Sequence, residues 1–214
     1  MSTVSEFTTA ELAETLVGLR EAAPPSILKV TTTMLHLLQH GKPVAPEELA
    51  SATGLEVGVA VQLARRLGTE FDEEGNIIGL GLTLVPTPHK YRANGKDLFA
   101  WCAMDTISSP SILNHTAVIE SPDPISGEIV RFSVTPDGVE GLEPSSAVVS
   151  WSLKSDIDNI RGSFCNLVHF FASRETAVEY VSKHPGLVIV PVEGMFEAAK
   201  TLRDTEAVKS FLED

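Results

Sequence analysis

One short segment places a thiol and a carboxylate at a spacing that suits proton transfer. In LFAWCAMDT, Cys102 precedes Asp105 by three residues. If this segment is helical, the two side chains share one helix face. A carboxylate next to a thiol can accept the thiol proton and pass it to another group. The alternative is that Cys102 is an inert core residue, as free cysteines commonly are.

A second segment, RGSFCNLVHFFAS, carries the other cysteine of the chain, Cys165, four residues before His169. A thiolate paired with an imidazole is one form of nucleophile site. In an extended segment the two side chains would be too far apart to hydrogen bond, so we expect His169 to be structural. Two cysteines exclude a four-thiolate zinc site. They allow one disulfide, but a reducing compartment would keep both as thiols.

The elements that must position these residues begin with a helical stretch. Hydrophobic periodicity predicts three or four helices in the first 68 residues, and the last two have a helix-turn-helix spacing around Gly54. A β-hairpin follows, with Gly75 and Asn76 in its turn. This order predicts a winged-helix-like N-terminal region over residues 1–84. Apolar positions such as Val57 and Leu67 indicate that its helices pack against the rest of the protein.

The remaining residues, 85–214, are predicted to form the catalytic domain, with α+β structure. Short strand-like runs, among them HKYRA, TAVIESPD and LVIVPV, are separated by Pro, Gly and Asp turns. Helices are predicted in KDLFAWCAMDTI, in ETAVEYVSKH and in VEGMFEAAKTLRDTEAVKSFLED. Strands and helices do not alternate regularly, which favours a mixed, mainly antiparallel sheet with helices over a doubly wound parallel sheet.

Composition limits the partners of the chain. Its 214 residues are 43% hydrophobic and carry a formal net charge of −13. This balance argues against nucleic acid or an anionic membrane as the main partner, because both attract positively charged surfaces. No apolar run reaches the roughly 18 residues of a membrane span. The first nine residues lack the pattern of a signal peptide. We therefore expect a soluble, cytoplasmic protein.

Taken together, four strings make the chain resemble the organomercurial (alkylmercury) lyases. They are DEEGNIIGLGLTL, KDLFAWCAMDT, RGSFCNLVHFFAS and SKHPGL, and they occur in the order and at about the spacing of that family. The resemblance extends from about Leu35 onward. AWCAMDT combined with SFCNLVHFFAS is the specific part of the signal. The fold that the resemblance implies also joins a winged-helix-like part to an α+β catalytic part.

The resemblance implies that Cys102, Asp105 and Cys165 are catalytic and that the carbon–mercury bond of R–Hg⁺ is cleaved by protonation, giving R–H and Hg²⁺. Thiolates suit this substrate because mercury is a soft metal. Cys102 is expected to capture the substrate, Cys165 to ligate second and supply a proton, and Asp105 to relay it; the sequence leaves the order of the two thiols open. Asn166 stands where some members have a further cysteine outside the trio.

The same resemblance implies small organomercurials as substrates and no resident cofactor. Excess cytosolic thiol would be needed for product release, and a cytosolic thiol or a mercuric reductase would accept Hg²⁺. Phe99 and Trp101 either line an apolar substrate pocket or pack in the core.

Two other functions are weighed against the lyase. One is a non-catalytic, thiol-based metal-binding protein, for which Asp105 would be unnecessary. The other is a winged-helix, metal-sensing regulator. Against the regulator, residues 1–80 hold five basic and eleven acidic side chains. Arg65 and Arg66 also lie at the end of the predicted recognition helix, away from the N-terminal positions that read bases.

Overall fold

A computed structural model describes residues 8–21, 23–153, 156 and 159–203. Its N-terminal part consists of helices followed by a hairpin, as the sequence predicts. The elements are α1 (Thr9–Glu21), α2 (Pro25–Leu38), α3 (Pro46–Thr53), α4 (Val57–Arg66), β1 (Glu70–Phe71) and β2 (Ile77–Leu80).

Local sequence explains where these elements begin and end. Pro25 occupies the first turn of α2, where a missing N–H costs no hydrogen bond. Gly54 ends α3 in the left-handed region, with φ 67°. The prediction for Val57 is wrong: it lies at the start of α4 and is 38% exposed. The buried face of this helix consists instead of Ala60 and Ala64, because small side chains let α4 approach its neighbours closely.

The main sheet has eight strands in the order β1-β2-β3-β5-β4-β6-β7-β8, and every pair is antiparallel. Its remaining strands are β3 (Leu82–Thr83), β4 (His89–Ala93), β5 (Lys96–Ala100), β6 (Ala117–Pro122), β7 (Ile129–Val134) and β8 (Val139–Glu143). The boundary expected after Leu84, between the N-terminal region and the catalytic domain, falls between β3 and β4. Strands from both sides of it belong to this one sheet.

A second sheet has three antiparallel strands in the order β10-β9-β11. The elements of this region, with the helices that flank it, are α5 (Ala103–Leu113), β9 (Val148–Ser152), α6 (Ile160–Ser163), the 3₁₀ turn η2 (Cys165–Leu167), β10 (Phe170–Phe171), α7 (Arg174–Ser182), β11 (Leu187–Pro191) and α8 (Val192–Arg203). The α+β class, with a winged-helix-like N-terminal part and a mainly antiparallel sheet, is confirmed.

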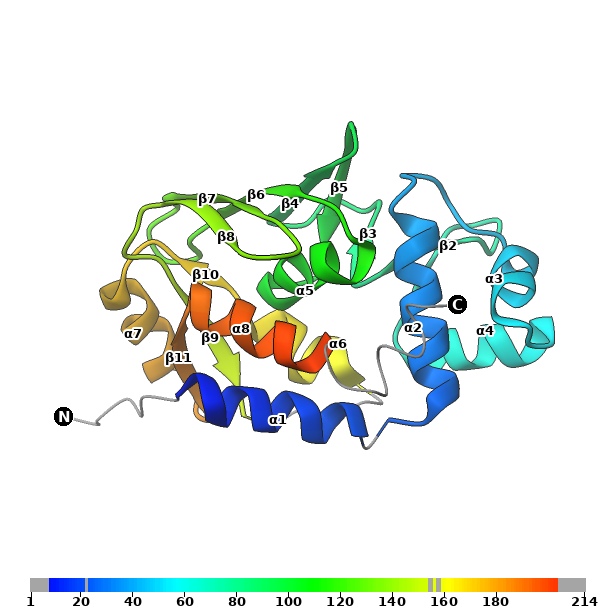
Figure 1. The fold of residues 1–214 in the computed structure, drawn as a ribbon, viewed down its shortest axis with the longest axis horizontal. Coiled ribbons are helices and arrows are strands. Elements are labelled where there is room, and N and C mark those ends of the chain that lie inside the picture. Colours follow the sequence, from blue (N-terminus) through cyan, green and yellow to red (C-terminus); the bar gives the residue numbers. More distant parts are fainter. Residues whose placement is uncertain (1–7, 22, 154–155, 157–158, 204–214) are drawn as a thin grey trace.

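The helices form layers beneath the main sheet (Figure 1). Helix α5 contacts β3, β4, β5 and β7 on one side and α8 on the other, and α1 packs along α8. Helix α2 contacts α5, β2 and β3, so the helical N-terminal part packs against the elements around α5. No helix in the described part of the chain is long and apolar enough to cross a membrane.

Two segments differ from the predicted elements. KDLFAWCAMDTI is not one helix: it forms strand β5 up to Ala100 and helix α5 from Ala103. The cross-strand pairing of Phe99 with Thr83 and Lys90 holds its first half extended. The C-terminal helix is described as far as Arg203, and the rest of that prediction, residues 204–214, lies outside the described residues.

Candidate active site

Cys102 lies at the junction between strand β5 and helix α5. It is the N-cap of α5, with extended backbone angles of φ −150° and ψ 175°. The backbone on both sides of it is tied to other segments. The Trp101 N–H donates to the Gly81 carbonyl at 2.8 Å, and the Ala103 N–H donates to the Val168 carbonyl at 3.1 Å. These two hydrogen bonds fix the backbone that presents the thiol.

Asp105 is the third residue of α5 and lies one turn beyond Cys102. Its Oδ2 accepts hydrogen bonds from the Cys102 backbone N–H and from the Cys102 Sγ–H, both at 3.1 Å. Cys102 and Asp105 form a capping box at the start of the helix. The prediction that both residues lie on one face of a single helix is therefore wrong. Cys102 precedes the helix, and the two side chains meet through the capping box.

Cys165 begins the short η2 turn, and strand β9 anchors that turn. The Ser150 hydroxyl donates to the Leu167 carbonyl at 2.6 Å and accepts from the His169 backbone N–H at 3.0 Å. Just before the cysteine, the Phe164 ring packs edge-on against the buried Trp151, with centroids 4.7 Å apart. The segment at Cys165 is thus a 3₁₀ turn, held by contacts on both sides of the cysteine.

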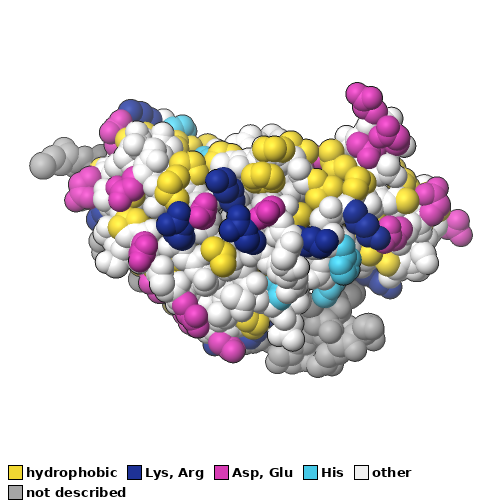
Figure 2. Space-filling view, turned by 90° about the horizontal axis from the view of Figure 1, so that it is seen from above, with side chains coloured by type: hydrophobic (Ala, Val, Ile, Leu, Met, Phe, Trp, Pro, Cys, Tyr) yellow, Lys and Arg dark blue, Asp and Glu magenta, His cyan; other side chains and the backbone are white. Residues whose placement is uncertain are grey.

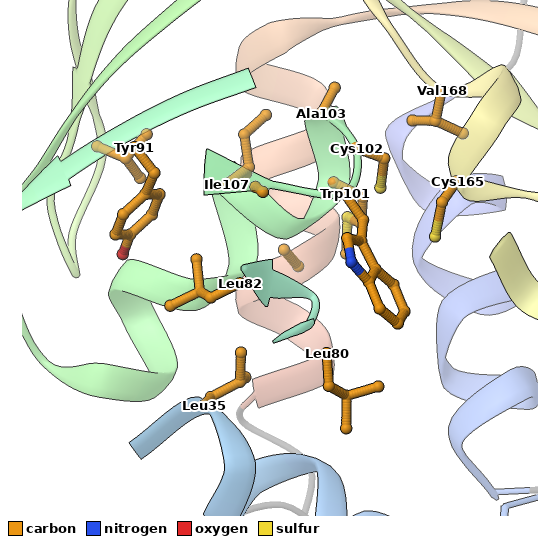
Figure 3. Packing of buried hydrophobic residues seen from close by; sticks show 14 of the residues in the cluster. Leu35, Leu80, Leu82, Tyr91, Trp101, Cys102, Ala103, Ile107, Cys165 and Val168 are labelled. Atoms are coloured by element: carbon orange, nitrogen blue, oxygen red, sulfur yellow. The ribbon is translucent and has the colours of Figure 1, made fainter. Parts of the chain in front are cut away.

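The two cysteines and the aspartate meet, although 60 residues separate Asp105 from Cys165. The ligand atoms of Cys102, Asp105 and Cys165 all lie within 4.8 Å of one another. Both cysteines are buried and neither is in a disulfide. Figure 3 shows their sulfur atoms near each other, beside the indole ring of Trp101. This arrangement offers two soft ligands and one proton acceptor to a single small reactant.

Burial and neighbouring groups shift the pKa of both partners in the capping box. Burial is the main cause that raises the pKa of Asp105 to about 6, against hydrogen bonds from Cys102 and the charge of Arg161, which lower it. Burial likewise raises the pKa of the Cys102 thiol, and the neighbouring Cys165 and Asp105 add to this. Cys102 is therefore a thiol at neutral pH, and a carboxylate able to take its proton is in direct contact with it.

Three polar residues that the sequence did not predict, Glu70, Thr83 and Arg161, gather around the Trp101 side chain, next to Cys102. The carboxylate of Glu70, on β1, accepts hydrogen bonds from Thr83 Oγ1 at 2.5 Å and from Trp101 Nε1 at 3.1 Å. It also forms an ion pair with Arg161, on α6. The Arg161 guanidinium lies 4.8 Å from the centroid of the Trp101 ring. No spacing rule predicts this group, because Glu70, Thr83, Arg161 and Trp101 come from four separate segments.

Two glycines leave room for these carboxylates. A Cβ on Gly79 would collide with the Glu70 carboxylate and with Thr83. Gly81 has φ 72°, and a Cβ there would lie 3.3 Å from Asp105 Oδ1. Both glycines belong to the string DEEGNIIGLGLTL, and their lack of a side chain leaves space for the carboxylates of Glu70 and Asp105.

Phe99 and Trp101, the two aromatic residues considered for the substrate pocket, lie in different places. Trp101 lies beside the thiols (Figure 3). Phe99 points to the other face of β5 from the buried Leu98 and Ala100, and with Lys90 and Val118 it lines an outer groove of about 220 Å³.

His169 does not pair with Cys165 in the way that a nucleophile site requires. Its Nε2 instead contacts the Asn166 carbonyl at 3.0 Å, as expected of a structural histidine.

Comparisons with known proteins identify the family of the chain. Residues 82–204 match the sequence model of the alkylmercury lyase family, and residues 8–81 match that of the helix-turn-helix domain of alkylmercury lyase. An alkylmercury lyase of Staphylococcus epidermidis is 39% identical over 203 residues, covering 94% of this chain and 92% of the relative. One of Pseudomonas putida is 41% identical over 189 residues, covering 86% and 89%.

A solved structure also resembles this fold. The crystal structure of the mercury-bound form of MerB2 superposes with a TM-score of 0.76 and 26% sequence identity, covering 95% of this chain and 99% of that one.

Proposed function

The chain belongs to the alkylmercury lyase family and is therefore an enzyme that acts on carbon–mercury bonds, and on this premise we propose that Cys102, Asp105 and Cys165 cleave such bonds by protonolysis. The observation that carries the proposal is the cluster itself, with two thiols and a carboxylate within 4.8 Å. Mercury in R–Hg⁺ is the substrate's own metal, and the two sulfur atoms are its natural ligands.

In the first step Cys102 captures the substrate. The thiol is protonated at neutral pH, so a sulfur–mercury bond forms as the Sγ proton leaves. Asp105 Oδ2, 3.1 Å from Sγ, is placed to accept that proton. With a pKa of about 6, Asp105 is mostly ionised at pH 7 and can also release the proton again. The products of this step are Cys102–S–Hg–R and a protonated Asp105.

In the second step the sulfur of Cys165 binds the same mercury atom and raises its electron density. Asp105 first releases the Cys102 proton to solvent and then accepts the proton of Cys165. It passes this second proton to the carbon–mercury electron pair, which releases R–H. In total, two thiols and R–Hg⁺ give a dithiolate Hg²⁺ complex, R–H and one proton, so atoms and charge balance. The exchange of the roles of the two thiols gives the same products.

Release of Hg²⁺ then needs competing thiols. Two molecules of a small thiol can displace the mercury and return their protons to Cys102 and Cys165. A cytosolic thiol or a mercuric reductase is the acceptor that we propose, with no resident cofactor and no nucleic acid or membrane partner. Trp101 lies next to the sulfurs and supplies an apolar surface for the organic group.

The experiment is incubation with phenylmercury and excess thiol, with benzene measured by gas chromatography. We expect turnover by the wild type and its loss in Cys102→Ser and in Cys165→Ser, with Cys102→Ser also losing most substrate capture. A matched control is Ser163→Ala, which changes a hydroxyl two residues before Cys165 without touching the thiols. Stoichiometric binding without any benzene would instead identify a metal-binding protein.

A further inference from the structure

We propose that Glu70 is a positioning residue that holds the two cysteine-bearing segments at the separation needed to share one mercury atom. The inference rests on the two-thiol mechanism proposed above. It concerns a residue of the N-terminal hairpin, which carries no ligand and lies outside the trio.

The contacts of Glu70 reach both segments. Trp101 donates to Oε2 and is the residue directly before Cys102. Arg161 pairs with Oε1 and lies four residues before Cys165. Thr83 Oγ1 donates to Oε2 at 2.5 Å and is held in turn by strand β3. One carboxylate therefore joins the Cys102 segment, the Cys165 segment and the edge of the main sheet.

A direct backbone bond between the segments supports the same geometry from the other side. The Ala103 N–H donates to the Val168 carbonyl, which lies three residues after Cys165. The cysteine segments are thus joined after each cysteine by this bond and before each cysteine through Glu70. Two attachments on opposite sides of the thiols restrict their relative movement more than either attachment does alone.

The surroundings keep Glu70 charged and in place. Its side chain is 16% exposed, and that of Arg161 is 36% exposed. Burial raises the pKa of Glu70, but the hydrogen bonds from Thr83, Arg161 and Trp101 outweigh it and the net pKa is lowered. Gly79 provides the space for the carboxylate, since a Cβ there would overlap it. A side chain with this many fitted donors differs from an ordinary surface ion pair.

Glu120 provides the comparison. Its carboxylate also pairs with an arginine, Arg131, at 2.8 Å, but on the outer face of the sheet. Glu120→Gln removes one carboxylate charge, as Glu70→Gln does, and it weakens the pairs with Arg131 and Lys90 without touching either cysteine segment. It is therefore the matched control.

The test measures how strongly the protein retains inorganic Hg²⁺ against a competing monothiol, glutathione, by equilibrium dialysis. A site with two positioned thiolates resists glutathione more than a site with one. In Glu70→Gln the amide oxygen can still accept from Trp101 and Thr83, but it has no charge with which to hold Arg161. We expect half-removal of Hg²⁺ at about 10–100-fold less glutathione, the usual effect of losing a group that orients metal ligands.

Three further arms complete the test. Phenylmercury turnover by Glu70→Gln should fall, while one-to-one capture of phenylmercury, which needs one thiol, should persist. Glu120→Gln should match the wild type in all three measurements. Arg161→Gln removes the same link from the other side and should reproduce the Hg²⁺ defect, so that the result does not depend on one variant folding well. Melting curves of each variant identify the folded fraction.

Wild-type retention of Hg²⁺ by folded Glu70→Gln and Arg161→Gln would overturn the positioning role. Failure of the two-thiol mechanism itself gives a different result: the wild type would retain Hg²⁺ no better than Cys165→Ser.

Discussion

At the scale of single residues, Asp105 has the properties of a group that both accepts and donates a proton. Its carboxylate touches the Cys102 sulfur, and its pKa of about 6 lies within about one unit of neutrality. A general acid–base group is most effective when its pKa is near the working pH. An aspartate in water, with a pKa near 4, would accept the thiol proton less readily and hold it less firmly.

We predict that Asp105→Asn binds an organomercurial but releases little hydrocarbon. The amide matches the carboxylate in shape and leaves both thiols in place, but it cannot carry the proton. Loss of one positioned proton-transfer group costs about 10²–10⁴ in rate. Quenching of Trp101 fluorescence should report stoichiometric binding, while benzene release measures chemistry. If Asp105 only caps the helix, the folded variant will turn over at nearly the wild-type rate.

A second prediction concerns stability and pH. In the unfolded chain Asp105 ionises near its ordinary value of 3.8, whereas in the folded protein burial delays ionisation to about 6. Between these values the folded state holds more protons than the unfolded state, so the contribution of Asp105 to stability decreases as pH rises. Two pKa units correspond to about 3 kcal/mol, and the loss is complete above about pH 7.

Asparagine does not titrate, so Asp105→Asn should gain stability relative to the wild type between pH 4 and pH 7. Denaturant unfolding of both proteins at each pH measures the difference, and the effects of all other groups cancel. A difference that does not change with pH would contradict the buried carboxylate.

Residue spacing alone identified only part of this site. Cys102 and Asp105 were recognisable because three residues separate them, and the pairing with Cys165 came from the family resemblance. Glu70 and Arg161 were not predicted, because they meet only after β1 and α6 have packed beside Trp101. Contacts between distant segments depend on tertiary packing, which leaves no periodic trace in the sequence.

At the scale of elements, the start of α5 combines a structural and a chemical role in one side chain. Cys102 is the N-cap of this helix, a position that favours Ser, Thr, Asp or Asn. A cysteine there is a weaker cap, and its thiol must remain available to the substrate. Helix α5 is therefore less stable than it would be with a serine at its N-cap, but the site has a reactive thiol there.

We predict that Cys102→Ser keeps or increases the melting temperature while losing most substrate capture. The serine hydroxyl can accept from the backbone N–H of Asp105 and donate to its carboxylate, so the capping box persists. Serine caps exceed non-polar caps by about 1 kcal/mol. Cys102→Ala is the control: it also loses capture, but it should melt at a lower temperature than Cys102→Ser. Equal melting temperatures for the two variants would show that the cap contributes nothing.

Helices whose ends are marked by particular residues were predicted well, whereas strands whose conformation depends on pairing with another strand were not. Pro25 marks the start of α2 and Gly54 marks the end of α3. Strand β5 was mistaken for helix because Lys96–Ala100 is half of a tight hairpin whose partner, β4, decides its conformation. Strand β8 was missed for a similar reason: its residues, VEGLE, show little hydrophobic alternation and extend along the edge of β7.

At the scale of the whole molecule, the first described helix packs on the last. Helix α1 lies along α8, which in turn contacts α5, the helix that carries Asp105 (Figure 1). Leu12 and Leu16 are buried in this contact region. The N-terminal region is therefore built into the support of the active site, and it is less free to act as a separate DNA-binding unit than its helix-turn-helix sequence indicates.

The distribution of charge leads to the last prediction, that the protein does not bind duplex DNA specifically at physiological salt. Figure 2 shows Lys and Arg side chains gathered across one face of the molecule, among hydrophobic and acidic ones. On the exposed face of the main sheet, Lys90 and Arg131 both pair with Glu120, and Arg92 pairs with Asp97 at 2.6 Å. Paired cations release few counterions from DNA, so they add little affinity.

The helix-turn-helix offers DNA no better surface. Arg65, at the C-terminal end of α4, stacks on Phe71, with its guanidinium 4.5 Å from the ring centroid. The net charge of −13 repels a polyanion at long range. Titration of labelled duplex pools by fluorescence anisotropy at about 150 mM salt should show no binding at micromolar protein, with or without Hg²⁺ on the thiols. Nanomolar, sequence-selective binding would contradict this prediction. It would mean that the winged-helix part presents a DNA-binding surface despite its charge and packing.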